Sequence, residues 1–464
     1  MSSSSSSSSS MSISPSTAIL TVVVLYSIKT AWDNAPSWIK DHFDKNDKTR
    51  GTDGSLKDAN DDLANPASIV TKLQDMFNLM YRESDDLLPD EMPWYKLYVC
   101  FISFLHNRAE VSLVHPEMRD ETNRAEGLKP HLKEVELIEE YAEYAEWAYD
   151  GSIVNLQKLL REKKMDLIRL DTATEPGRVG HFIVSDKATK RIIVAIKGTS
   201  TFSDVLTDLV GTTVLHGNTR YHEGMYTAAQ MMLDDLQPLL QEFFLPAGYN
   251  VVITGHSLGA GVACLLGALL KDSIPELVHN KKKRLSVFAY ATPACMSYDA
   301  CLRCKDYMTS VVNNTDCVPR LSVCSMRILH RMLLRIDQAL VDKGLDPSDW
   351  TTASKYAQDL LKIDDDLLLT KQQLTVCLDK ILKEEEPNMQ KDYAIFVPGK
   401  VVCVWECSEA DALTVDARVG TAGMASVRVT DVATTMVTDH GTANYRKNLA
   451  CLLKEAKSNS KFEG

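Results

Sequence analysis

The chain has 464 residues, of which 45% are hydrophobic and 25% charged, a composition typical of a globular protein and not of a collagen, a coiled coil or a disordered chain. Its formal net charge is −12, and basic residues form no long block, so no nucleic-acid partner is expected. The length favours about three domains.

Residues 1–66 are predicted to form a disordered tail and a polar linker, because residues 2–10 are a serine run and residues 44–66 are strongly polar. The apolar run at 18–28 is shorter than the about 20 residues of a membrane span. A signal peptide has a positive charge before such a run, whereas Lys29 follows it. We therefore expect a cytoplasmic or peripherally membrane-associated protein, with a secretory signal or a short N-terminal anchor as alternatives.

After a predicted helical region at 67–132, residues 133–325 and 391–456 are predicted to form one α/β domain, followed by a tail at 457–464. Strands are expected at 181–185, 191–196, 250–254, 285–291, 308–313, 393–397, 400–407 and 425–429, and helices at 134–149, 153–163, 224–244, 258–271 and 442–454. Apolar strands that alternate with helices favour a mostly parallel sheet covered on both faces.

Residues 326–390 interrupt this alternation, because they are amphipathic and helical without a strand pattern. We predict a helical insertion, and a lid or regulatory segment is one interpretation of it. Arg327, Arg331 and Arg335 recur every four residues beside an apolar stripe. A basic amphipathic helix can lie on an anionic lipid surface. The alternative is a solvated arginine face on a packed helix.

The eleven cysteines are scattered, which favours reduced thiols over a disulfide framework. Cys301 and Cys304 form a C-x-x-C, with Cys317 and Cys324 downstream. A zinc site would need all four to converge, and neither a second C-x-x-C nor a histidine pair supports it. We therefore expect no metal and no cofactor.

One motif carries most of the chemical information, the G-x-S-x-G run Gly255-His256-Ser257-Leu258-Gly259. A predicted strand ending at Thr254 enters the motif and a predicted helix leaves it, the arrangement of a nucleophile elbow, in which the serine occupies a strained strand-to-helix turn. Glycines flank the serine because the backbone there crowds the neighbouring strand and helix. Ser257 is therefore the candidate nucleophile.

A serine nucleophile needs a base and an acid that orients the base, in the chain order Ser, Asp or Glu, His. Two histidines lie beyond the strands that follow the motif: His330, inside a helical stretch of the insertion, and His440, in a loop before the last helix. Asp316 follows the strand ending at Asn313, and the carboxyl ends of strands hold active-site residues. We predict Ser257 as nucleophile, Asp316 as orienting acid and His440 as general base.

An oxyanion hole requires two donors. The backbone amide of Leu258 is one candidate, and the amide and hydroxyl of Thr199, in the loop after the strand at 191–196, are the other. Four apolar residues follow at helical spacing, Phe202, Val205, Leu206 and Leu209. This stripe is interpreted either as a lid or acyl-chain wall, or as an ordinary core-facing helix.

Three blocks together resemble the class 3, or fungal-type, lipases, and in particular the sn-1-specific diacylglycerol lipases. They are I-K-G-T-S-T-F-S-D-V-L-T-D-L at 196–209, G-H-S-L-G-A-G at 255–261 and V-V-N-N-T-D-C-V-P-R at 311–320, with weaker similarity at 397–400 and 436–440. Lys197 stands where an arginine is usual in the family. The resemblance implies an α/β-hydrolase fold and hydrolysis of glyceride esters.

The expected function is that of a serine lipase that hydrolyses acylglycerols through an acyl-enzyme, with diacylglycerol at sn-1 as the first candidate substrate. The expected partners are this lipid and the surface of a membrane or lipid droplet. Two alternatives stay open: a non-catalytic, lipase-like signalling scaffold, and a lipase that acts on triacylglycerol, phospholipid or galactolipid.

Overall fold

The computed structural model describes residues 129–172, 177–199, 213–279, 283–349, 369–409, 412–430 and 435–460, and isolated positions within 96–104 and 351–356. The chain separates into two compact units. One comprises Met1–Phe104 and Ile336–Leu368, and the other comprises Leu105–Arg335 and Leu369–Gly464. The predicted tail at 1–66 lies outside the described residues, and the predicted division into domains stays a prediction.

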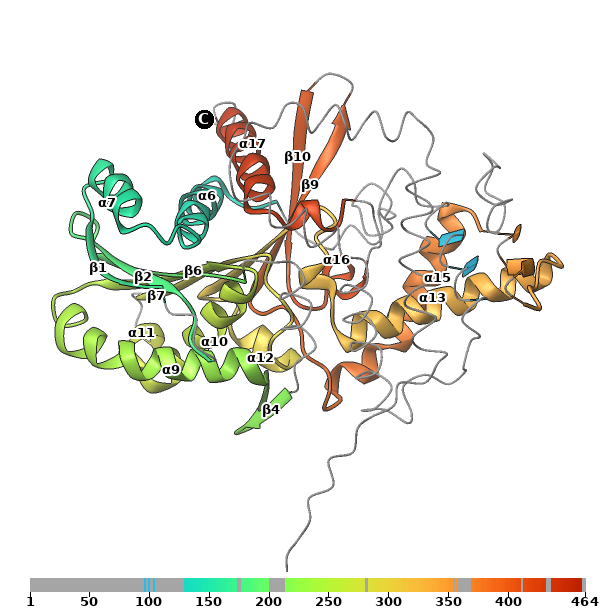
Figure 1. Ribbon diagram of the computed structural model, residues 1–464, viewed down its shortest axis with the longest axis horizontal. Helices are drawn as coiled ribbons and strands as arrows, with labels where there is room; N and C mark the ends of the chain where they lie inside the picture. The colour runs from blue at the N-terminus through green and yellow to red at the C-terminus, as the bar shows by residue number, and fades with distance from the viewer. Residues whose placement is uncertain are drawn as a thin grey trace, which may run out of the picture. The chain divides into compact units, whose positions relative to one another are not determined.

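The second unit is built on a sheet for which the described residues supply eight strands, in the order β1-β2-β3-β6-β7-β8-β9-β10 (Figure 1). The strands are β1 (Asp166–Asp171), β2 (His181–Asp186), β3 (Arg191–Ile196), β6 (Asn250–His256), β7 (Leu285–Tyr290), β8 (Met308–Asn313), β9 (Lys400–Glu409) and β10 (Ala412–Gly420). The pairs from β3 through β9 are parallel, whereas β1–β2, β2–β3 and β9–β10 are antiparallel. The predicted mostly parallel sheet is confirmed.

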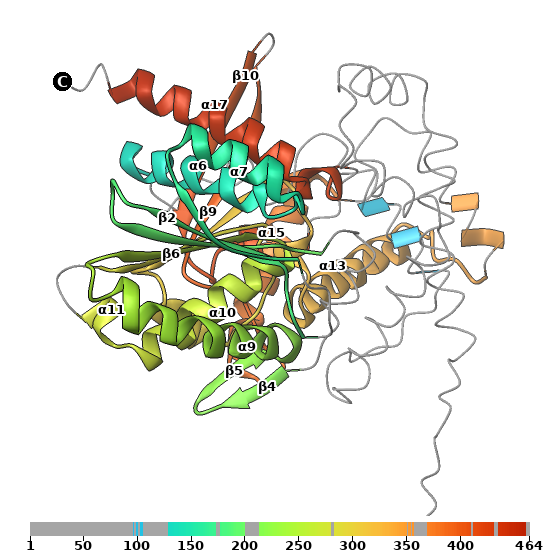
Figure 2. The same cartoon turned by 60° about the vertical axis from the view of Figure 1, so that its left-hand side comes forward.

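Helices cover both faces of this sheet, as Figure 2 shows. One face carries α6 (Leu132–Trp147), α7 (Ile153–Glu162) and α17 (Thr442–Ser460), and the other carries α9 (Glu223–Leu239), α10 (Leu258–Ser273), α11 (Glu276–His279) and α12 (Tyr298–Arg303). Successive side chains of a strand point to opposite faces. In β3, Ile193 packs with α6 and α17, whereas Ile192 and Val194 pack with α9 and α10. The continuous apolar runs of the central strands follow from this double burial.

The described residues form several further elements. They are the hairpin of β4 (Thr213–His216) and β5 (Thr219–His222), the helices α13 (Val323–Asp342), α15 (Lys371–Glu384) and α16 (Ala425–Arg428), and the single turns η3 (Leu240–Phe244), η4 (Val318–Arg320), η5 (Glu386–Gln390) and η6 (Thr438–His440). Among the described residues, no helix is both long enough and apolar enough to cross a membrane.

Two predicted strands are wrong. The helix α16 occupies Ala425–Arg428, and residues 393–397 make only an isolated bridge between Phe396 and Met296. Most residues of both runs are buried. A short buried apolar run does not distinguish a strand from other buried backbone. Conversely, the edge strand β1 was not predicted, because its side chains are largely exposed or half-buried and give no apolar run.

The predicted helices of the insertion are present as α13 and α15, and two of the three stripe arginines are paired with carboxylates. Arg327 Nε lies 3.1 Å from Glu385 Oε2, and Arg331 lies 2.8 Å from Glu385 Oε1. Arg331 also pairs with Glu384. The Glu385 side chain is only 5% exposed, so these contacts join α13 to the end of α15. The pairing favours a packed helix over a lipid-facing one.

Candidate active site

The elbow forms between β6 and α10, where Ser257 has φ 59° and ψ −129°. A side chain in this region is strained, so the surrounding backbone must enforce it. A Cβ on Gly255 would lie 2.5 Å from the carbonyl oxygen of Gly259, and a Cβ on Gly259 would lie 2.4 Å from that of Ile196. Both contacts are with backbone, which cannot move aside. The two glycines of the motif therefore allow α10 to start directly against β6 and β3.

The structure brings the three predicted triad side chains together. His440 Nε2 lies 3.0 Å from Ser257 Oγ, and His440 Nδ1 lies 3.0 and 3.2 Å from the two carboxylate oxygens of Asp316. An ionised carboxylate only accepts, so Nδ1 carries the proton and the Nε2 lone pair faces the serine hydroxyl. Ser257 can therefore pass its proton to a base whose ring is already oriented.

Asp316 is completely buried yet is held in its charged form. Burial raises the pKa of its carboxyl, but the charge of His440 and the hydrogen bonds from His440, Tyr445 and the Val318 N–H bring that pKa below its ordinary value. The Tyr445 hydroxyl donates over 2.6 Å and the Val318 amide over 3.0 Å. The acid therefore stays ionised and fixes the tautomer of His440.

The loop that carries the acid, residues 313–316, is held by a buried arginine. Arg320 is completely buried, and its guanidinium donates to the carbonyl oxygens of Asp316, Asn314 and Ser426 at 2.6, 2.6 and 2.7 Å. Its guanidinium also lies 5.3 Å from the ring centroid of Trp405, a cation–π contact. The three carbonyl oxygens thus accept hydrogen bonds from the buried guanidinium of Arg320. The same hydrogen bonds fix the loop that carries Asp316.

The turn that carries the base, η6, is tied to the same loop. The Asp439 carboxylate accepts from the amide and hydroxyl of Thr315 at 3.2 and 2.7 Å. The Asn313 side chain donates to the Asp439 carbonyl at 3.1 Å and accepts from Asn448 at 2.7 Å. Sequence reasoning did not find these ties. The signal was present in the polar residues directly beside Asp316 and His440, but not in which of them pair.

The loop after β3 passes beside the nucleophile. A Cβ on Gly198 would lie 3.3 Å from the Cβ of Ser257, and half-buried Thr199, the predicted oxyanion donor, directly follows Gly198 in the chain. The amide of Leu258 belongs to the first turn of α10, whose N–H groups lack intrahelical acceptors. The predicted lid or acyl-pocket residues, Phe202, Val205, Leu206 and Leu209, lie outside the described residues.

His256, predicted only as part of the elbow, makes contacts of its own. Its Nδ1 lies 2.9 Å from the Tyr149 hydroxyl, and its Nε2 lies 2.8 Å from the carbonyl oxygen of His440. Burial lowers the pKa of His256 to about 3, and the charge of neighbouring His440 adds to this lowering. The ring is therefore neutral at physiological pH.

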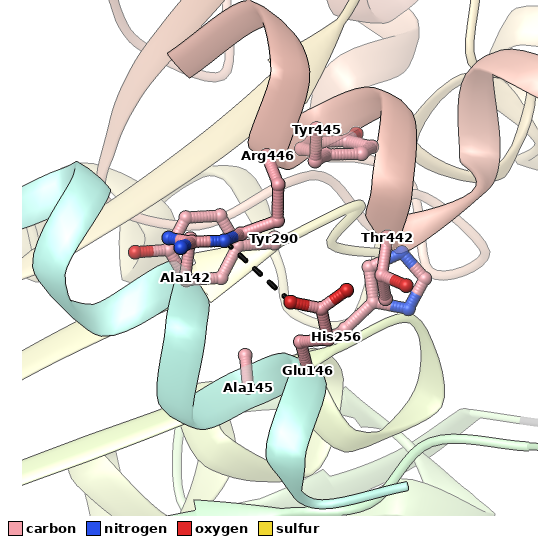
Figure 3. A pocket seen from close by; sticks show the side chains of 8 residues that line it. All are labelled: Ala142, Ala145, Glu146, His256, Tyr290, Thr442, Tyr445 and Arg446. Carbon is pink, nitrogen blue, oxygen red and sulfur yellow. Dashed lines mark ion pairs between the residues drawn. The ribbon is translucent and has the colours of Figure 1, made fainter. Parts of the chain in front are cut away.

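Figure 3 shows a small pocket beside this ring, between α6 and α17. The ion pair between Glu146 and Arg446, with 3.5 Å between the charged atoms, crosses it. Its lining residues are Ala142, Ala145, Glu146, His256, Tyr290, Thr442, Tyr445 and Arg446. Ser257 does not line it, so this pocket is not the place where a substrate would meet the nucleophile.

In the part of the chain that the structure describes, no cluster of three or more His, Cys, Asp or Glu side chains could hold a metal ion. Cys301, Cys304 and Cys317 are buried free thiols, and Cys324 is a half-buried one. Burial raises the pKa of Cys301 well above its ordinary value, which keeps this thiol protonated.

Comparison with known proteins gives consistent matches. Residues 193–326 match the family model described as lipase (class 3). The chain is 32% identical over 172 residues to diacylglycerol lipase-alpha of Homo sapiens, which covers 34% of this chain and 16% of that protein. It is 28% identical over 172 residues to a lipase of Rhizopus niveus, which covers 34% of this chain and 42% of that protein. The chain thus spans less than half the length of either relative.

Among solved structures, a lipase from Rhizopus microsporus var. chinensis matches with a TM-score of 0.38 and 24% identity, over 42% of this chain and 71% of that one.

Proposed function

We propose that the chain is a serine lipase that hydrolyses a lipid ester through an acyl-enzyme, because residues 193–326 match the class 3 lipase family model. The observation that carries this proposal is the unbroken hydrogen-bonded chain from Ser257 through His440 to Asp316. In this proposal Ser257 is the nucleophile, His440 the general base and Asp316 the acid that orients the base.

In the first half-reaction, Ser257 Oγ attacks the ester carbonyl carbon while its proton passes to His440 Nε2. The carbonyl oxygen becomes an oxyanion, which the amide of Leu258 and the amide and hydroxyl of Thr199 are proposed to stabilise. The tetrahedral intermediate then collapses. The bond to the alcohol oxygen breaks, and that oxygen takes the proton from His440. The glycerol part leaves as an alcohol and the acyl group stays on Ser257.

The second half-reaction repeats these steps with water. His440 Nε2 removes a proton from the water as its oxygen attacks the acyl carbon, and the same donors hold the second oxyanion. When this intermediate collapses, Ser257 recovers its proton from His440 and a fatty acid leaves. Asp316 stays ionised throughout and stabilises the imidazolium form of His440 in both half-reactions.

As the substrate we propose an acylglycerol, with diacylglycerol at its sn-1 ester first. The names of the matched relatives support this choice, since they include diacylglycerol lipases as well as fungal lipases. Such a lipid is insoluble, so we also propose that the enzyme works at a membrane or lipid-droplet surface reached from the cytoplasm. Phe202, Val205, Leu206, Leu209 and the insertion at 326–390 stay predicted covers of the site.

The decisive experiment treats the purified full chain with a fluorescent fluorophosphonate, a probe that reacts with activated serines. We expect labelling of the wild type and of Ser286→Ala, a control at a half-buried serine of β7, but no labelling of Ser257→Ala. The kcat of Ser257→Ala should fall about 10⁶-fold with its melting temperature preserved. An unlabelled wild type would instead favour the signalling scaffold.

A panel of vesicle-borne lipids then tests the finer proposal. Mono-, di- and triacylglycerol, phospholipid and galactolipid are compared at equal surface concentration, with the position of the released acyl chain determined. The highest kcat/KM is expected for diacylglycerol cleaved at sn-1. A higher kcat/KM for any other lipid would leave the proposed hydrolase activity in place and would refute diacylglycerol as the preferred substrate.

A further inference from the structure

The catalytic steps above leave one buried ionisable side chain beside the nucleophile without a role. His256 is 4% exposed and directly precedes Ser257. Its ring centroid lies 4.7 Å from that of His440 and 5.8 Å from that of Tyr149. Burial of a polar ring is costly unless its nitrogens are bonded, so both contacts of the ring matter.

The two contacts of His256 determine its tautomer. Nε2 faces the carbonyl oxygen of His440, which only accepts, so Nε2 must carry the proton. Because the ring is neutral, Nδ1 must then be a lone pair, and the Tyr149 hydroxyl 2.9 Å away must donate to it. Tyr149 is able to do so, because burial raises the pKa of its phenol well above the ordinary value.

Tyr149 also lies against the loop that leads to Thr199. A Cβ on Gly198 would lie 2.3 Å from its phenol oxygen, so the loop and the phenol are packed against each other. Tyr149 therefore contacts the loop after β3 on one side, and on the other side it is hydrogen-bonded to His256, which in turn bonds the backbone of the base.

We propose that Tyr149 is a positioning residue that acts through His256: its hydroxyl bonds Nδ1 of the ring whose Nε2–H anchors the His440 backbone, and its phenol packs against the loop that leads to Thr199. This inference rests on the proposed hydrolase function. In this proposal the two residues keep the base and the oxyanion donors correctly placed around Ser257. Neither residue touches the reacting atoms.

Without the Tyr149 hydroxyl, Nδ1 of the buried His256 ring would be an acceptor that has lost its donor, which favours rotation of the ring or a change of tautomer. With the proton on Nδ1, the Nε2 lone pair of His256 would face the carbonyl oxygen of His440, and two acceptors at 2.8 Å repel each other. The turn carrying His440 would shift away from Ser257. A misplacement of about 1 Å in a catalytic group costs on the order of 10²-fold in rate.

The test compares Tyr149→Phe with wild type on a soluble short-chain ester. We expect kcat to fall about 10- to 100-fold with KM within about twofold, because alignment is lost and not substrate binding. The matched control is Tyr144→Phe, which removes the hydroxyl of another α6 tyrosine, bonded to Met165 Sδ at 3.2 Å. The control should keep wild-type kcat. Unchanged kcat in Tyr149→Phe would overturn the proposal.

A double variant tests whether Tyr149 acts through His256. His256→Gln places an amide N–H near the position of Nε2 and removes the Nδ1 atom that Tyr149 bonds. Tyr149→Phe should therefore cost clearly less in the His256→Gln background than in wild type. Equal losses in the two backgrounds would reduce Tyr149 to a structural contact and refute its action through His256.

A second pair of variants keeps the proposal testable if Tyr149→Phe does not fold. His256→Gln should retain several times the kcat of His256→Leu, which offers no donor to the His440 carbonyl. Equal kcat in these two variants would refute the anchoring of the base. An inactive, unlabelled wild type would instead refute the proposed hydrolase, so the two failures are distinguishable.

Discussion

The elbow and the pair of segments that carry the acid and the base reach comparable precision by opposite means. The elbow is one run of five residues, held in place because Gly255 and Gly259 lack side chains. Asp316 and His440 are 124 positions apart, and they are held because particular side chains are present, Arg320 and Asp439 foremost. The elbow depends on the absence of side chains at its two glycines, whereas the acid and base segments depend on hydrogen bonds between polar side chains.

This difference predicts different responses to mutation. A Cβ added to Gly255 would lie 2.5 Å from backbone, which cannot move aside without displacing the whole elbow. A single added carbon should therefore disturb the entire elbow. The acid and base segments are joined by several hydrogen bonds, and the loss of one leaves the others in place. The four predictions that follow test this contrast.

The largest effect is expected at the base. His440→Ala should lower kcat by about 10⁶-fold, because base and nucleophile act as a unit. His330→Ala, in α13, should leave kcat within about twofold. Both are measured with a soluble ester on purified protein, with circular dichroism to verify folding. Comparable losses at the two histidines would remove His440 from the proposed triad.

The next effect tests the elbow. In Gly255→Ala the new Cβ would overlap the backbone of Gly259, so α10 must move away from β6. We expect at least about a 10²-fold loss of fluorophosphonate labelling rate, together with a destabilisation of about 1–3 kcal/mol. The comparison is Gly151→Ala, where an added Cβ meets no atom within 4 Å. A wild-type labelling rate in Gly255→Ala would show that the elbow accommodates a Cβ at position 255, which would contradict the prediction.

A graded effect is expected from Arg320→Lys. The charge is kept, but one ammonium cannot reach three carbonyl oxygens arranged for a fork. We expect kcat to fall about tenfold and stability to fall by about 1–3 kcal/mol, because buried carbonyl groups lose their donors. Kinetics and urea unfolding measure the two effects. A loss of kcat as large as that of His440→Ala would contradict the view that several hydrogen bonds together hold the acid and base segments.

The smallest effect concerns pH. The pKa of Asp316 is lowered in the folded state, so this group stabilises the fold above its ordinary pKa and loses that contribution as the pH falls through the folded value. Tyr445→Phe removes a donor to the carboxylate and so raises the folded pKa. We expect the variant to be about 1–2 kcal/mol less stable at pH 7.

This difference between Tyr445→Phe and wild type should narrow as the pH falls through the folded pKa of Asp316, because protonation removes the charge that the hydroxyl stabilises. It should not vanish, because Tyr445 also accepts from the Asn313 amide at 3.1 Å. Melting temperatures from pH 7 to pH 3 measure the trend. A difference independent of pH would mean that Tyr445 does not act on the charge of Asp316.

The contrast also explains what could be predicted from the sequence. The position of Ser257 follows from a local motif, and Asp316 and His440 follow from chain order and strand ends, so the three residues that the structure brings together were identifiable. Their catalytic roles stay proposals. Tyr149 was not identifiable, because its partner His256 is 107 positions away. Arg320 was not identifiable, because it bonds backbone carbonyl oxygens, which every residue carries. Periodicity and spacing carry no record of such pairs.

The fold divides in the same way. The central strands β3, β6, β7 and β8 were predicted because burial on both faces demands continuous apolar runs. The edge strand β1 and the hairpin partner β10 carry mixed polar sequences, and their strand character comes from the neighbour they pair with.

The backbone of Ser257 has a consequence for engineering. Its φ of 59° suits glycine and strains serine, at a cost of about 1–3 kcal/mol. Glycine at this position would relieve the strain and abolish the nucleophile. A library of variants sorted only for thermal resistance should therefore enrich glycine at 257, and the resulting proteins would be more durable and catalytically dead. Selection for stability in this chain must be coupled to a screen for turnover.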